Sequence, residues 1–142
     1  MKTPYDNDVV AWAKEQAALL RAGNLKEIDV LNIAEEIEDV GKSVQHELAS
    51  RLAVLLAHLL KWKFQQRLRG NSWKRTIREQ RRGIVRCLRS SPSLKHTLSN
   101  RAWLDGVWSE ATQQAEQQTS LIFPDAWIWS FSQVMDTGFF PD

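Results

Sequence analysis

Five arginines recur at helical spacing along one stretch of the chain. A helix is expected from Trp73 to about Arg89, and at 3.6 residues per turn the arginines share one face of it, opposite the apolar residues. This arginine stripe consists of Arg75, Arg78, Arg82, Arg86 and Arg89, with only Glu79 beside it. Because like charges on one face repel, something should oppose them, and a phosphate backbone would suit arginine's bidentate contacts. The alternatives are a solvated face, or acids placed opposite within the fold or across a dimer, such as Glu35, Glu38 and Asp39.

Arg81 departs from this pattern because it falls in the apolar stripe of the same helix, between Ile77 and Ile84. A buried guanidinium needs a partner, since an isolated buried charge is costly. We expect Glu36, at the edge of the apolar stripe of the second helix, to pair with Arg81, with His58 nearby. The pair is either a polar site within the bundle or a structural ion pair that fixes helix register.

His58 also lies beside the apolar stripe of its helix, where it is either a general base or a hydrogen-bonded packing residue. Six residues separate it from Arg51, a spacing similar to the Arg-x(4–6)-His motif of a superfamily of helical ribonucleases. Such a spacing also arises easily by chance. On one helix the two residues would lie about 10 Å apart, so a single chain would need a bend or a dimer to join them.

Other motifs that carry chemistry are absent from the sequence. It has no glycine-rich phosphate loop, G-x-S-x-G, H-E-x-x-H or paired-carboxylate motif, so we expect no catalytic residue and lean against an enzyme. His46 and His96 lack metal-ligand spacing, and Cys87 is the only cysteine, so we expect no metal and no cofactor. The seven tryptophans either form a binding surface or, more simply, fill the core.

Amphipathic helices must position these residues, since apolar residues recur every three or four positions and no strand pattern is found. The first expected helix runs from Asp6 or Asn7 to Ala22 and is closed by Gly23, and the second is capped by Asp29 and broken or kinked at Gly41. The remaining ones are a third from Ser43 to about Arg69; a fourth capped by Asn71 or Ser72; a fifth from Leu94 to about Gln118, either continuous or broken near Asn100; and a short one from Ser130 to Met135. Short polar connections favour antiparallel neighbours. We therefore predict an all-α antiparallel bundle of four to six helices, in a single domain over residues 1–142.

Composition fits such a domain, because 43% of the 142 residues are apolar and 25% are charged. Net charge is unevenly spread: residues 61–89 carry 11 Lys/Arg and one acid, a charge of +10, while the rest carries −8. The first ten residues lack the apolar core of a secretory signal, and no apolar run is long enough to span a bilayer. A cytoplasmic protein with no membrane partner is the resulting expectation.

The segment from Tyr5 to Leu98 resembles a bacterial family known as domain of unknown function 29. The residues that carry the resemblance are Tyr5, Trp12, Glu15 to Arg21, Glu35 to Glu38, Gly41, His58 to Trp62, Ser72-Trp73, Thr76 to Arg81 and Ser91 to Leu94. Residues 99–142 resemble the family less closely, and Asp125-Ala126-Trp127 stands where a Cys-Pro-Trp-like turn is expected. The resemblance implies an all-α fold and brings no catalytic residue.

Three functional hypotheses follow. The first is a non-enzymatic interaction module that binds a protein partner or itself, based on the missing catalytic motifs and the many aromatics. The second is nucleic-acid binding through the arginine stripe, with or without ribonuclease activity at Arg51 and His58. The third is a small-molecule site around Arg81 and Glu36. Whether the stripe is open or covered in the structure discriminates best among them.

Overall fold

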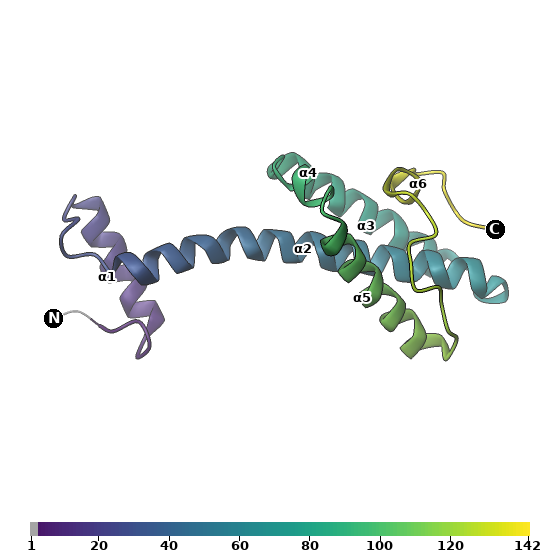
Figure 1. Cartoon of the computed structure of the whole chain (residues 1–142), viewed down its shortest axis with the longest axis horizontal. Coiled ribbons are helices and arrows are strands. Elements are labelled where there is room, and N and C mark those ends of the chain that lie inside the picture. The colour runs from purple at the N-terminus through teal and green to yellow at the C-terminus, as the bar shows by residue number, and fades with distance from the viewer. Residues whose placement is uncertain (1–2) are drawn as a thin grey trace. The chain divides into compact units, whose positions relative to one another are not determined.

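The computed structural model describes residues 3–142, and in that range the chain is all helix and loop, with no strand. Six α-helices and one short 3-10 turn follow each other along the chain (Figure 1): α1 (Val9–Arg21), α2 (Val30–Phe64), the 3-10 turn η1 (Gln66–Leu68), α3 (Asn71–Ser90), α4 (Leu94–Thr97), α5 (Arg101–Thr119) and α6 (Phe131–Met135). The prediction of an all-α helical bundle is confirmed.

The chain divides into two compact units, one over residues 1–43 and the other over residues 44–142. Helix α2 contributes its first part to the first unit and the remainder to the second. The first unit has a net charge of −4 and the second +6. That the whole chain behaves as a single domain stays a prediction.

The first unit is a helical hairpin whose ends are set by polar residues. Asp8, rather than Asp6 or Asn7, caps α1 by accepting hydrogen bonds from the amides of Val10 and Ala11, each 3.1 Å long. Gly23 follows the helix with a φ of 72°, as expected for a glycine at this position. Asp29 then starts α2 by accepting from the amide of Asn32 at 3.3 Å.

Helix α2 runs through Gly41 without a break, so the predicted break and the predicted cap at Ser43 are both wrong. A glycine inside a helix costs only about 1 kcal/mol relative to alanine, and Gly41 does not adopt the positive φ that would end the helix. The same helix stops at Phe64, five residues earlier than predicted, because η1 occupies residues 66–68.

The hydrophobic core lies in the second unit. The later half of α2 runs beside α3 and α5 in Figure 1, and side chains from all three helices form one buried cluster. Leu52, Ile84 and Ala111 are each fully buried representatives of these helices. Burial of this kind stabilises by roughly 25 cal/mol per Å² of apolar surface, which makes the cluster the main source of stability in the unit.

The C-terminal segment closes one side of this unit. Ser130 and Gln133 form a reciprocal capping box at the start of α6, which explains why so short a helix begins there. Beyond α6 the tail is held by cationic side chains: Arg69 Nη2 donates to the carbonyl of Pro141 at 3.0 Å, and Lys63 Nζ to that of Asp142 at 3.3 Å.

Candidate functional site

Helix α3 separates its side chains into a buried face and a charged face. Ile77, Gly83, Ile84 and Cys87 are buried against the core. The whole predicted arginine stripe is exposed: Arg75, Arg78, Arg82, Arg86 and Arg89. The 3.6-residue period of the helix therefore holds five guanidinium groups on one side of it, over about 21 Å from the first to the last.

No carboxylate neutralises this stripe within residues 3–142. The ion pairs among the described residues join Arg51 to Glu47 and Arg101 to Asp105, both at 3.2 Å, and none involves a stripe arginine. Glu79 is the one acid beside the stripe on α3, so this face keeps a large excess of positive charge and is attractive to a polyanion.

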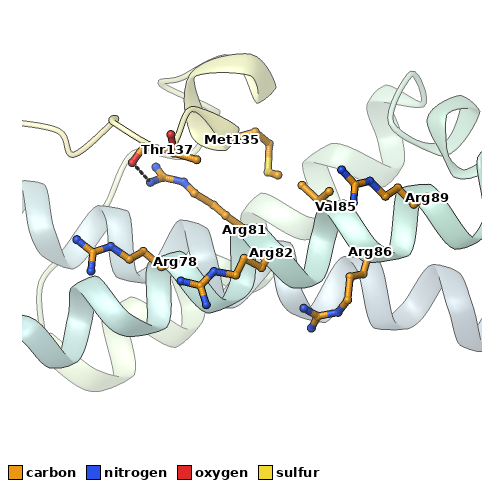
Figure 2. Close-up of a pocket in the computed structure, with 8 residues that line it drawn as sticks. All are labelled: Arg78, Arg81, Arg82, Val85, Arg86, Arg89, Met135 and Thr137. Carbon is orange, nitrogen blue, oxygen red and sulfur yellow. Dashed lines mark hydrogen bonds between the residues drawn. The ribbon is translucent and has the colours of Figure 1, made fainter.

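A groove runs beside the stripe, between α3 and the end of α6 (Figure 2). Its volume is about 460 Å³, and its lining combines arginines with apolar side chains: Arg78, Arg81, Arg82, Val85, Arg86, Arg89, Met135 and Thr137. A second hollow of about 420 Å³ shares Arg78 and Arg82 with the first and continues past Arg75 to Asn71, at the start of α3, with Lys74 and Glu79 also in its lining. The cationic surface is thus concave along much of the helix.

Arg81 is the buried member of the groove, with only 3% of its surface exposed. Its Nε donates to the carbonyl of Val134 at 2.8 Å, and its two Nη atoms donate to those of Thr137 at 3.4 Å and Phe139 at 2.7 Å. The guanidinium also lies 5.4 Å from the ring centroid of Phe140. Burial lowers the pKa of Arg81, although a guanidinium stays charged in proteins.

The partner predicted for Arg81 is wrong. Glu36 accepts a hydrogen bond from the hydroxyl of Tyr5 in its own unit, and Arg81 is satisfied by carbonyls. The last carbonyls of a helix lack partners inside it, and a cation at that end also complements the helix dipole. Arg81 therefore caps the C-terminal end of α6 by donating to carbonyls there. No residue near Phe139 predicts this role from the sequence.

His58 and Arg51 are engaged separately rather than with each other. His58 Nδ1 lies 2.8 Å from the carbonyl oxygen of Val54, and burial lowers the pKa of its imidazole. Arg51 pairs with Glu47 and donates to Gln80 Oε1 at 3.3 Å. Because α2 is unbroken between them, two helical turns keep Arg51 and His58 about 10 Å apart, and the ribonuclease-like pair is not assembled within one chain.

A glycine that sequence reasoning missed makes room for Arg51. A Cβ added to Gly83 would overlap Arg51 Nη1 and lie 2.8 Å from Cζ, so this guanidinium crosses α3 where the helix has no side chain. Cys87 is buried beside this crossing, and burial raises the pKa of its thiol. The only available signal was a glycine inside an otherwise strong helix.

The tryptophans of the C-terminal region pack inward rather than forming an exposed platform. Trp108 is buried and its Nε1 donates to the carbonyl of Pro124 at 2.9 Å. Trp127 and Trp129 lie against it at centroid distances of 5.4 and 6.0 Å, and Trp127 Nε1 donates to the carbonyl of Leu104. The abundance of aromatics is therefore explained by the core of the second unit.

Residues 3–142 also offer neither a metal site nor a membrane-spanning helix. No group of three or more His, Cys, Asp or Glu side chains in this range is arranged to hold a metal ion. None of the helices described there combines the length and apolar character that crossing a bilayer requires.

Comparison with known proteins identifies the family. No curated protein and no solved structure matches the chain. A family model described as "Domain of unknown function DUF29" matches residues 4–140. The match therefore extends into the C-terminal part of the chain, which resembles the family less closely. The chain therefore belongs to the DUF29 family.

Proposed function

We propose that this protein binds the phosphate backbone of nucleic acid along the arginine stripe of α3. The observation that carries the proposal is that five exposed arginines line one helix face without a carboxylate partner in residues 3–142. Bidentate guanidinium–phosphate contacts and the release of counterions would make such a face bind a polyanion. The groove beside the stripe adds the apolar contacts of Val85 and Met135, suited to a base or sugar next to the phosphates.

Salt dependence tests the proposal. Binding of labelled single-stranded RNA, single-stranded DNA and duplex DNA is measured by fluorescence anisotropy between about 50 and about 200 mM salt. If each arginine meets one phosphate, the slope of log K against log salt should be about −3.5 to −4.5. Absence of binding at the lowest salt, or a flat salt dependence, would overturn the proposal.

Matched variants separate the stripe from general positive charge. The triple variant Arg78→Gln, Arg82→Gln and Arg86→Gln should weaken binding and make the slope shallower by about 2–3. The control triple, Arg21→Gln, Lys26→Gln and Lys42→Gln, removes the same charge from exposed positions of the first unit and should leave the slope unchanged. Equal losses in both triples would show that net charge rather than the stripe drives binding.

Protein-partner binding is a second candidate function, and a different observation favours it. The packed tryptophans no longer support it, but the first unit exposes large apolar side chains on α2, including Val30, Ile37 and Val40. Exposed apolar surface that recurs along one helix face is characteristic of an interaction site. The small-molecule hypothesis has less support, because Arg81 and Glu36 each have partners within their own unit.

A further inference from the structure

The first part of α2 carries a second regular pattern, independent of the arginine stripe. Val30, Ile33, Ile37 and Val40 follow one another at spacings of three, four and three residues. This is the a/d spacing of a two-heptad seam, the pattern with which a helix packs against another helix of the same kind. We name these four residues the α2 seam.

Most of the α2 seam is open. Val30 is 60% exposed, and Ile37 and Val40 are each 67% exposed. On the same helix, the leucines of the later part are completely buried in the second unit: Leu48, Leu52, Leu55, Leu56, Leu59 and Leu60. Helix α1 and the segment before it cover a neighbouring part of the surface, because the Tyr5 hydroxyl donates to Glu36 and Trp12 Nε1 donates to Asp29 Oδ2 at 3.0 Å. The hairpin therefore covers one side of the seam and leaves the other unpacked.

Small residues flank the open side. Ala34 and Gly41 are seven residues apart, so they lie on one face, next to Ile37. Gly41 costs helix stability, yet nothing lies within 4 Å of the Cβ that a side chain would add there. Within one chain this glycine has no packing role, whereas a helix from outside could approach the backbone closely at this point.

The charges of α2 indicate which helix that is. At 100° per residue, Glu35 and Asp39 lie on the side of α2 opposite the seam and Glu38 lies beyond Ala34, and all three are exposed. One flank of the seam is formed by the uncharged Ala34 and Gly41, and the other by Glu36, whose carboxylate accepts a hydrogen bond from the hydroxyl of Tyr5. Two identical seams that approach along the uncharged flank therefore keep Glu35 and Asp39 apart and leave Glu36 bonded to Tyr5, which limits the like-charge repulsion that usually opposes self-association.

We propose that the α2 seam docks against the same seam of a second copy of this chain. The apolar pattern is self-complementary, and its β-branched residues suit a coiled-coil contact. Because the seam spans only two heptads, the interface is small, and dissociation in the micromolar range is expected. The proposal does not depend on nucleic-acid binding, since it uses the first unit and not the arginine stripe.

The mass of the full chain measured over a hundredfold range of concentration tests this proposal. Sedimentation equilibrium should show the 16.4 kDa chain moving toward twice that mass as concentration rises. Ile37→Glu and Val40→Glu should each weaken association at least tenfold, because they place a charge in the interface. Leu31→Glu is the matched control: Leu31 is 84% exposed on the acidic side of the same helix, and its change should leave association unaffected.

A second pair of variants guards against effects on folding. Gly41→Leu should favour the helix yet weaken the dimer by blocking close approach, whereas Gly106→Leu in α5, where space is also open, should change nothing in the mass. A chain that stays monomeric throughout overturns the proposal. A dimer that survives both seam variants, or that Leu31→Glu disrupts equally, is held by another surface and overturns it too.

Discussion

In the first unit, Tyr5, Trp12 and Gln16 each have a polar partner, while Val30, Ile37 and Val40 face solvent. The second unit shows the reverse. Its apolar residues from α2, α3 and α5 share one buried cluster, while five arginines of α3 have no carboxylate partner among the described residues. One unit thus leaves apolar surface uncovered, and the other leaves charge unpaired.

The difference between the two units is instructive because the same helix, α2, contributes residues to both. Its apolar residues keep a helical period throughout, but only the later part has α3 and α5 to cover it. A helix face becomes core where the chain brings another element to it, and otherwise remains a surface for a partner. This difference is why the two open surfaces are proposed to bind different ligands: another apolar helix for the first unit, a polyanion for the second.

The largest effect expected from the difference between the two units is in hydrogen exchange of their backbone amides. Amides of residues 52–62 should exchange only by global unfolding, whereas those of α1 should open locally, because the first unit buries little beyond Trp12 and Gln16. We expect the two opening free energies to differ by several kcal/mol, a large part of a domain's total stability. Equal protection in both helices would show one cooperative domain over residues 1–142 and remove the distinction between units.

Arg81→Ala should produce a large loss of stability for a charged residue on α3. It removes donors from three carbonyls of the C-terminal segment, and we expect a cost of about 3 kcal/mol or more in urea denaturation. The neighbouring exposed Arg82→Ala is the control, with an expected change within about 0.5 kcal/mol. Matching midpoints for the two variants would mean that Arg81 does not hold α6 and the tail.

A smaller, pH-dependent effect is expected from His58. Burial lowers the pKa of this imidazole below its ordinary 6.5, so the unfolded chain binds its proton at higher pH than the folded chain does. The free energy of unfolding should therefore fall as pH drops below about 6.5, by less than about 1.4 kcal/mol per pH unit. Melting temperatures recorded across this window measure it.

Two histidine variants isolate the contribution. In His58→Gln the decrease should be reduced, because the buried group no longer titrates. The exposed His46→Gln, on the same helix, should keep the full pH dependence. If the melting temperature of the wild-type chain is unchanged between pH 7 and 5.5, the buried imidazole does not destabilise the fold at low pH. If both variants lose the decrease in stability, the buried imidazole of His58 is not the source of that decrease.

Local sequence signals predicted much of the fold. Gly23 ends α1, Asp29 begins α2 and Ser130 begins α6 through side-chain or backbone properties that act within one turn. The arginine stripe was also predictable, because helical periodicity alone places its members together on one face. Gly41 misled the prediction, since a single glycine weakens a helix without ending it.

The partners of Arg81 could not be predicted in the same way. Backbone carbonyls are present at every residue and carry no sequence signature, so the expectation of Glu36 rested on charge alone. The groove was likewise unpredictable, because Met135 and Thr137 reach α3 from more than 40 residues further along the chain.

The amino-acid sequence by itself determined the helices, the uneven charge and the faces on which apolar and basic residues gather, since these depend on spacing within a few turns. Only the tertiary structure decided which faces are covered. It packed most of the tryptophans against the core, turned Arg81 toward the end of α6, and left the arginine stripe and most of the α2 seam open. The physical reason is that burial and pairing depend on what distant segments bring to a surface, and those contacts are not encoded in the periodicity of any one helix.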